Sequence, residues 1–135
     1  MAPSSQPARE PLVSLVVPVF NEIEAIDAFY ERATQALGAL EGMAYEIVFI
    51  DDGSVDGSYQ RLAQFAKQNA RIRVLKLSRN FGHQIAISAG IDYAKGDCAV
   101  IIDADLPDPP EGVADMIAKW PEGFDGVSGV RSDRP

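Results

Sequence analysis

IIDADLPDPPE, residues 101–111, is the stretch that decides the fold of this chain. An apolar run from Cys98 to Ile102 ends there in two carboxylates one residue apart, Asp103 and Asp105. Ligands of open α/β sheets bind outside the carboxyl ends of the strands, so the run predicts a strand that carries a carboxylate pair to that edge. Such a pair suits a divalent cation, because Mg²⁺ often bridges protein carboxylates to phosphates. A solvated turn is the alternative for an isolated Asp-x-Asp, and the preceding buried strand favours function.

Length and composition predict one globular domain. The chain has 135 residues, of which 47% are hydrophobic and 24% charged, and both values are ordinary for a soluble domain. The formal net charge of −8 argues against nucleic-acid binding, which needs a basic face. The single cysteine, Cys98, is predicted to be a buried hydrophobe and favours a reducing, cytoplasmic compartment. Residues 1–11 are predicted to be a disordered tail, and no stretch approaches the ~20 apolar residues of a membrane span.

Apolar, β-branched runs alternate with amphipathic segments along the chain. Such runs are typical of strands buried on both faces of a parallel sheet. Strands are predicted at 12–20, 45–50, 72–78, 97–102 and 126–130, and helices at 22–41, near 56–69, at 83–95 and after Asp108. With right-handed crossovers, this β-α-β-α-β-α-β-α-β order predicts an α/β fold with a doubly wound, mostly parallel sheet over residues 12–135.

Local signals predict where individual helices begin and end. Asn21 with Glu24 three residues later predicts a capping box for the first helix, and Gly42 is expected to end it. The helix at 83–95 is rich in Ala and Ile, so we expect it to be covered on most sides. Gly96 is predicted to follow that helix in the left-handed conformation.

Three acidic sites follow the ends of three different predicted strands: Glu22, Asp51-Asp52, and Asp103 with Asp105. Each has a simpler explanation, such as a first-turn helix residue for Glu22 or a turn with an N-cap for Asp51-Asp52. Together they predict one crevice, because parallel strands end at the same edge. Two carboxylate sites that repel one another imply a metal or a hydrogen-bonding ligand.

Other residues give weaker indications. Neither a dinucleotide fingerprint nor a P-loop is present in the sequence. Arg79, Arg131 and Arg134 are candidate phosphate partners, since guanidinium binds phosphate bidentately, although Arg131 and Arg134 also fit a solvated tail. His83, the single histidine, follows Gly82 near a helix N-terminus, where we expect capping or packing.

Five stretches resemble, in order, the signature segments of the inverting family 2 glycosyltransferases, which have the GT-A fold. The resemblance covers residues 12–134 and is strongest to the polyprenyl-phosphate branch, the dolichol-phosphate mannose synthases and bacterial undecaprenyl-phosphate glucosyltransferases. The stretches are VPVFNE (17–22), DDGSVDGS (51–58), SRNFGHQIAISAGIDYAKGD (78–97), DADLPDPPE (103–111) and GVRSDR (129–134).

The resemblance implies roles for ten residues of one nucleotide-sugar site. It implies that Asp105 holds Mg²⁺ or Mn²⁺ and is the catalytic residue, and that Arg131 holds the diphosphate. The other implied residues are Pro18, Phe20 and Glu22 at the nucleoside, Ile50, Asp51 and Asp52 at the base, and Asp103 and Ala104 at the ribose and diphosphate.

The same resemblance implies an enzyme that transfers a hexose from a UDP- or GDP-sugar to a polyprenyl phosphate at the cytoplasmic face of the membrane. One departure is Pro107, where the family often has a glutamine that can be a second metal ligand. A second departure is length, because relatives continue into an acceptor region and, in the bacterial branch, two membrane helices. We therefore expect a C-terminally truncated donor domain, inactive or incomplete alone and membrane-associated only through segments missing here.

Two other function classes remain open from the residues. A non-catalytic nucleotide-sugar binder would use the same site without transfer. A receiver-like signalling domain has similar length and clustered Asp residues that bind Mg²⁺. It would place an acidic pair after the first strand and a Lys after the fifth, whereas this chain has Phe20-Asn21-Glu22 and Arg131 there.

Overall fold

The computed structural model describes residues 10–104 and Gly112, which contain a parallel sheet flanked by helices. In chain order the elements are β2 (Leu12–Val19), α1 (Ile26–Gly38), β3 (Ala44–Asp51), α2 (Ser58–Gln68), β4 (Ile72–Lys76), α3 (His83–Tyr93) and β5 (Cys98–Ile101). All match predicted elements. The tail over residues 1–9, the helix after Asp108 and the strand at 126–130 lie outside the described residues.

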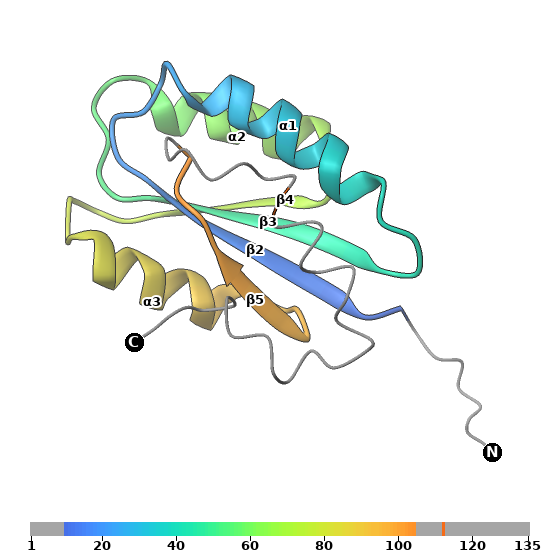
Figure 1. The fold of residues 1–135 in the computed structure, drawn as a ribbon. Helices are drawn as coiled ribbons and strands as arrows, with labels where there is room; N and C mark the ends of the chain where they lie inside the picture. The colour runs from blue at the N-terminus through green and yellow to red at the C-terminus, as the bar shows by residue number, and fades with distance from the viewer. Residues whose placement is uncertain (1–9, 105–111, 113–135) are drawn as a thin grey trace.

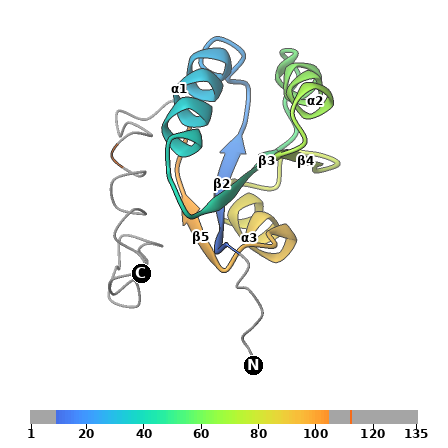
Figure 2. The ribbon, with the colours of Figure 1, turned by 90° about the vertical axis from the view of Figure 1, so that its right-hand side faces the viewer.

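The sheet is doubly wound, as predicted. Its strand order is β4-β3-β2-β5, and every described pair is parallel. The chain moves outward from β2 to β4 with α1 and α2 on one face, and then returns past β2 to β5 with α3 on the opposite face (Figures 1 and 2). Right-handed crossovers require this change of face when the direction of winding reverses. A receiver domain has the order 2-1-3-4-5, so the observed order is evidence against that alternative.

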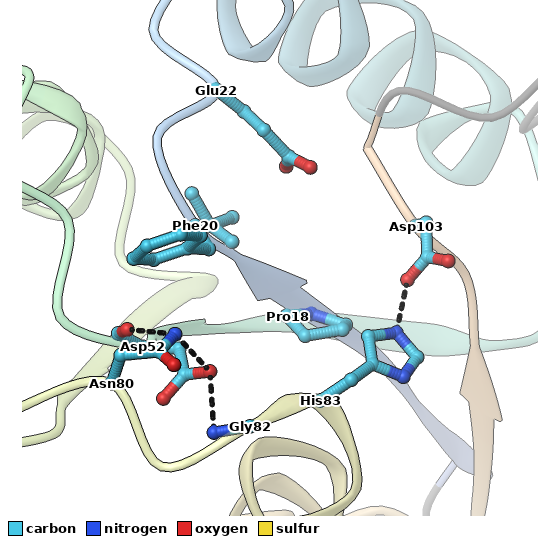
Figure 3. A pocket seen from close by; sticks show the side chains of 9 residues that line it. Pro18, Phe20, Glu22, Asp52, Asn80, Gly82, His83 and Asp103 are labelled. Atoms are coloured by element: carbon cyan, nitrogen blue, oxygen red, sulfur yellow. Dashed lines mark hydrogen bonds and ion pairs between the residues drawn. The ribbon is translucent and has the colours of Figure 1, made fainter.

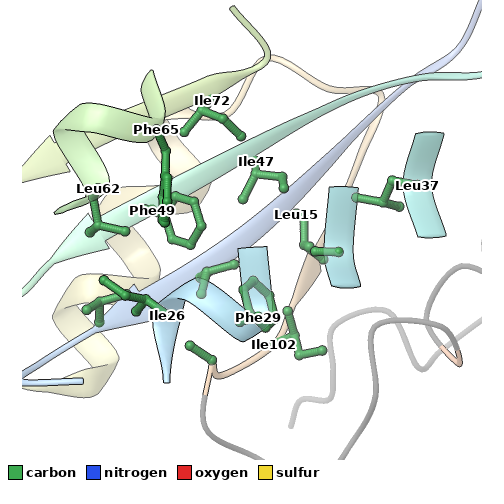
Figure 4. Close-up of a cluster of buried hydrophobic side chains, with 14 of the residues drawn as sticks. Leu15, Ile26, Phe29, Leu37, Ile47, Phe49, Leu62, Phe65, Ile72 and Ile102 are labelled. Carbon is green, nitrogen blue, oxygen red and sulfur yellow. The ribbon is translucent and has the colours of Figure 1, made fainter. Parts of the chain in front are cut away.

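Alternation along the strands divides the core into two layers. Odd-numbered residues of β2, such as Leu15 and Val17, face α1 and α2, whereas Val16 packs with Ile50 toward α3. Phe29 of α1 meets Phe49 of β3 edge to face, with ring centroids 6.2 Å apart. The larger layer (Figure 4) includes Leu15, Ile26, Phe29, Leu37, Ile47, Phe49, Leu62, Phe65, Ile72 and Ile102. Burying one such large side chain contributes about 1.5–3 kcal/mol.

The predicted capping box at Asn21 is wrong. Helix α1 begins at Ile26, and Asn21 adopts the left-handed conformation with φ 52°, which asparagine tolerates better than most residues. Its Oδ1 accepts from Val55 N at 2.8 Å, and its N–H donates to Ser54 Oγ at 2.8 Å. Asn21 therefore joins the loops that follow β2 and β3. Gly42 does not end α1 either, because the helix stops at Gly38.

Gly96 is needed for space and not for a left-handed turn. Helix α3 ends at Tyr93, and Gly96 is not among the residues with positive φ. A Cβ at Gly96 would lie 2.8 Å from both Leu12 O and Ser14 N. The glycine N–H also donates to Ser14 Oγ at 2.8 Å. The close approach of the two backbones explains the glycine.

Helix α3 is less covered than predicted. Only Ala86 and Gly90 are buried, while Ile85 and Ile91 are 51% and 45% exposed. Gly90 allows the helix to sit directly on Val16 and the neighbouring strand, since a Cβ there would lie 2.7 Å from Val16 Cγ1. No helix in the described part of the chain is long and apolar enough to cross a membrane.

A buried polar cluster ties the amino ends of the strands together. Glu46 of β3 accepts from Ser14 Oγ at 2.5 Å, from Lys95 N at 2.7 Å and from Arg73 Nη1 at 2.9 Å. Burial alone would raise the pKa of Glu46, but these hydrogen bonds outweigh that effect and hold the pKa below its ordinary value. The ionised carboxylate thus stabilises the fold at the edge opposite the candidate site.

Candidate functional site

A cleft of about 370 Å³ opens at the carboxyl ends of the strands. It lies where the strand order reverses between β2 and β5, which is where open α/β sheets bind their ligands. The β2 end, the β3 end, the β4–α3 loop and the β5 end all contribute. The lining residues (Figure 3) are Pro18, Val19, Phe20, Glu22, Asp52, Asn80, Gly82, His83 and Asp103.

Asp52 is buried and holds the loop that precedes α3. Its carboxylate accepts from Phe81 N at 2.8 Å and from Gly82 N and Asn80 Nδ2, each at 3.1 Å. The residue is 3% exposed. These N–H groups immediately precede α3, and a carboxylate at a helix N-terminus is favoured by the partial positive charge there. Asp52 thereby fixes one wall of the cleft.

Gly53 allows the loops after β3 and β4 to meet backbone to backbone. A Cβ on Gly53 would lie 2.6 Å from Arg79 C, and Gly53 has φ 86°. Gly82, at the N-cap of α3, has φ 107°. The loop after β3 therefore packs directly on the loop after β4.

Asp103 and His83 pair across the cleft. Asp103 lies two residues beyond the end of β5, and its Oδ1 is 2.9 Å from His83 Nε2. The side chains are 26% and 56% exposed, respectively. His83 does not cap α3, because that helix has no side-chain cap, and its ring lines the cleft.

These contacts change the electrostatic argument for a metal. Asp52 and Asp103 each have protein donors, so their mutual repulsion does not by itself require a cation. Within residues 10–104 and Gly112, no three His, Cys, Asp or Glu side chains group so that they could hold a metal ion. The predicted metal ligand, Asp105, lies outside the described residues.

Three residues at the end of β2 form the opposite wall. Phe20 presents a ring that is 44% exposed, and Pro18 also lines the cleft. Glu22 extends its carboxylate toward the cleft (Figure 3). Its backbone N–H donates to Ser58 Oγ at 3.0 Å, and its carbonyl accepts from Ala25 N at 2.9 Å. The wall is therefore apolar at Phe20 and acidic at Glu22.

Three residues predicted for the site do not line the cleft. Ile50 is fully buried and packs toward α3, and Ala104 is 9% exposed in the other core layer. Asp51 is fully buried, and its Oδ2 accepts from Ser54 N at 3.3 Å. Alternate side chains of a strand point to opposite faces, so adjacent residues such as Ile50 and Asp51 cannot both point the same way.

The predicted phosphate partners are not assembled in the described cleft. The guanidinium carbon of Arg79 lies 4.1 Å from the Phe81 ring centroid, and Arg79 is not among the lining residues. Arg131 and Arg134 lie outside the described residues.

Sequence reasoning missed Val19, Asn80, Gly82 and His83. For Asn80, Gly82 and His83 the signal was available, because β4 is parallel to its neighbours and so must also end at this edge.

Comparison with known proteins finds one family over most of the chain. The sequence profile of glycosyl transferase family 2 matches residues 14–135. An uncharacterized glycosyltransferase of Bacillus subtilis, YkcC, is 46% identical over 121 residues, which are 90% of this chain and 37% of that protein. The bactoprenol glucosyl transferase of Shigella phage SfV is 44% identical over 122 residues, 90% of this chain and 39% of that protein. The chain therefore spans about two fifths of the length of these curated relatives.

Solved structures with the same fold include two glycosyltransferases. A mannosyltransferase from Pyrobaculum calidifontis, in complex with GDP-Man and Mn²⁺, has a TM-score of 0.68 at 21% identity, over 90% of this chain and 39% of that one. TarS 1-349 from S. aureus, in complex with UDP-GlcNAc, also has a TM-score of 0.68, at 22% identity, over 83% of this chain and 32% of that one. At such identities the likeness establishes the fold.

Proposed function

The chain belongs to glycosyl transferase family 2 and has the GT-A fold, and from that premise we propose that its cleft is the donor site of an inverting hexosyltransferase. The proposal rests on one observation: Glu22, Asp52 and Asp103, from the ends of three strands, line one cleft where the strand order reverses between β2 and β5. Such a cleft offers acceptors for the hydroxyl and N–H groups of a nucleotide sugar, and Phe20 offers an apolar surface for its base.

The donor is proposed to be a UDP- or GDP-sugar. One structural neighbour was solved with GDP-Man and another with UDP-GlcNAc, which supports a nucleoside diphosphate sugar and leaves base and sugar open. The acceptor is proposed to be a polyprenyl phosphate, because relatives at 44% identity carry the name bactoprenol glucosyl transferase. Transfer would then take place at the cytoplasmic face of a membrane.

The two cleft aspartates would meet different parts of the donor. An ionised carboxylate has about four lone-pair sites. Asp52 uses three for the loop before α3, so one site remains for a base N–H. In Asp103, Oδ1 is paired with His83, and Oδ2 is available to a ribose hydroxyl.

Mg²⁺ or Mn²⁺ is the proposed cofactor, with Asp105 as the ligand that this chain would supply. The carboxylate character of the cleft fits a hard cation, which takes oxygen ligands. When bound, the cation would offset the charge of the departing diphosphate. We assign Arg131 to the same diphosphate. A lipid phosphate is already ionised near neutral pH, so its oxygen can attack the anomeric carbon without a strong base from this chain.

Calorimetric titration with UDP-glucose and GDP-mannose tests the proposal. The wild-type chain should bind one of them with Mn²⁺ present. Asp105→Ala should abolish the metal-dependent part of the affinity, and Asp103→Ala should weaken binding with or without metal. Asp92→Asn, an exposed carboxylate on α3 away from the cleft, is the matched control and should bind as wild type does. Equal losses in all three variants would contradict the assignment.

Turnover provides a separate test of completeness. With undecaprenyl phosphate in detergent, the 135-residue chain should bind donor but form no glycolipid, since it spans about two fifths of its relatives' length. Glycolipid formation at the rate of a full-length relative would contradict the view that acceptor residues lie elsewhere.

A further inference from the structure

We propose that His83 is a positioning residue, whose imidazole fixes the Asp103 carboxylate so that its second oxygen faces the donor. The proposal rests on the proposed function, because the value of a fixed carboxylate lies in the nucleotide sugar that it meets. His83 was not expected to belong to the site, and it reaches the site only through the geometry of the β4–α3 loop.

Asp103 needs such support because it lies beyond the sheet. The last residue of β5 is Ile101, and the Ile102 N–H still donates to Val16 O at 3.1 Å. Asp103 has no backbone bond of this kind to a neighbouring strand among the described contacts. In the described part of the chain, the hydrogen bond that holds its carboxylate is the one to His83, at 2.9 Å.

His83 is itself held on a rigid element. It is the first residue of α3, and the preceding N–H groups of Phe81 and Gly82 are bound by Asp52. Ala86, one turn later, is fully buried against the sheet, and its N–H donates to Gly82 O at 3.0 Å. A chain of contacts thus runs from the β3 end through the loop to the β5 end. The support spans the whole cleft from one side of β2 to the other (Figure 3).

The chemistry of the pair sets the direction of the hydrogen bond. An ionised carboxylate only accepts, so Nε2 must carry the proton. In a neutral imidazole with its proton on Nε2, Nδ1 is an acceptor. Rotation of the Asp103 side chain is restrained through Oδ1, and Oδ2 stays available. Without His83 the carboxylate would have to be ordered when the donor binds, which corresponds to about three- to tenfold weaker binding.

The pair can be observed directly because His83 is the only histidine in the sequence. Its ring nitrogens give unambiguous signals in long-range proton–nitrogen correlation spectra, recorded at about pH 8, where histidine is usually neutral. We expect the nitrogen shifts of a pure Nε2–H tautomer in the wild type. Asp103→Ala should move both shifts toward tautomer-averaged values, and Asp92→Asn should leave them unchanged. Unchanged shifts in Asp103→Ala would overturn the pairing.

Donor affinity then tests positioning, with variants that separate shape from hydrogen bonding. His83→Gln keeps an N–H donor of similar reach and should bind the nucleotide sugar within about twofold of wild type. His83→Phe keeps a ring without the donor and should bind about three- to tenfold more weakly. In the Asp103→Ala background, His83→Phe should have no further effect, because a residue that acts through Asp103 has nothing left to position.

The outcomes distinguish this proposal from the proposed function. If the wild type binds donor and His83→Phe binds equally well, only the positioning role is overturned. The same holds if the effects of His83→Phe and Asp103→Ala simply add. If the wild type binds neither UDP-glucose nor GDP-mannose, both the proposed function and the positioning role are overturned. His83 is more than half exposed, so these variants should fold, and circular dichroism checks that they do.

Discussion

Replacing Asp52 by alanine should destabilise the protein strongly, although Asp52 lies in the candidate site. The carboxylate accepts from Phe81 N, Gly82 N and Asn80 Nδ2 and is 3% exposed. Asn80 is exposed and can turn its amide to water. The two backbone N–H groups cannot turn, and since both residues are half-buried, the cost of about 1–3 kcal/mol for a fully buried unsatisfied donor is an upper bound for each. Since the loop can relax in part, we expect the free energy of unfolding to fall by about 2–4 kcal/mol.

Urea unfolding followed by circular dichroism measures this loss. Asp27→Ala is the control, because it removes an exposed ion pair, 2.6 Å from Arg61, that should be worth about 0–1 kcal/mol. The stability loss in Asp52→Asn should lie between those of Asp52→Ala and Asp27→Ala. Its oxygen can serve Gly82 and Asn80, but its NH₂ then faces the N–H of Phe81. A loss for Asp52→Ala no larger than that for Asp27→Ala would refute the reasoning that Asp52 holds the loop.

Three further predictions follow from packing, titration and sequence. Glu46→Gln should cost about 1–3 kcal/mol at neutral pH. Because the folded pKa of Glu46 is lowered, its contribution is fully present above the ordinary pKa of a glutamate and is lost as the pH falls through the folded pKa. The urea midpoints of the two proteins should therefore converge in acid. Gly90→Ala should destabilise the protein by about 1–3 kcal/mol, because the added Cβ overpacks the core. Gly38 has open space around it, so Gly38→Ala should be neutral or stabilising. Equal urea midpoints for the two variants would contradict this prediction. Pro107→Gln should raise the Mn²⁺ affinity of the protein in the absence of nucleotide. It should also reduce the coupling free energy between metal and nucleotide binding by on the order of 1 kcal/mol. Electron paramagnetic resonance with and without UDP measures both, and no change would mean that position 107 does not supply a metal ligand.

The fold could be predicted from the sequence because the strands form continuous apolar runs. Runs such as 12–20 and 45–50 are apolar on both faces, which only a sheet covered on both sides requires. The helix boundaries were less predictable, because Asn21 and Gly96 have uses that a local pattern does not encode. Asn21 binds Val55, which is 34 residues away in sequence, and Gly96 makes room for Ser14 of β2. Both uses depend on tertiary neighbours.

In the candidate site, too, the positions at strand ends were predictable, whereas contacts between distant residues were not. Glu22, Asp52 and Asp103 were predictable because each follows a strand end, where side chains converge whatever the detailed packing. The individual roles were not predictable. Ile50 packs toward α3, and Asp51 is buried on the other side of the strand with Ser54, so neither lines the cleft. The hydrogen bond between His83 and Asp103 depends on where α3 begins, which is set by Asp52 across the fold.

The central claim is that the sheet edge between β2 and β5 binds a nucleoside diphosphate sugar. Titration of the isotope-labelled chain with UDP-glucose and, separately, GDP-mannose in the presence of Mg²⁺, followed by amide chemical shifts, tests it most directly. We expect saturable shifts with at least one ligand at residues 19–22, 52–53, 80–83 and 103. Shifts confined to other surfaces, such as the groove between α1 and α2 that Arg61 lines, or no shifts with either ligand, would contradict it.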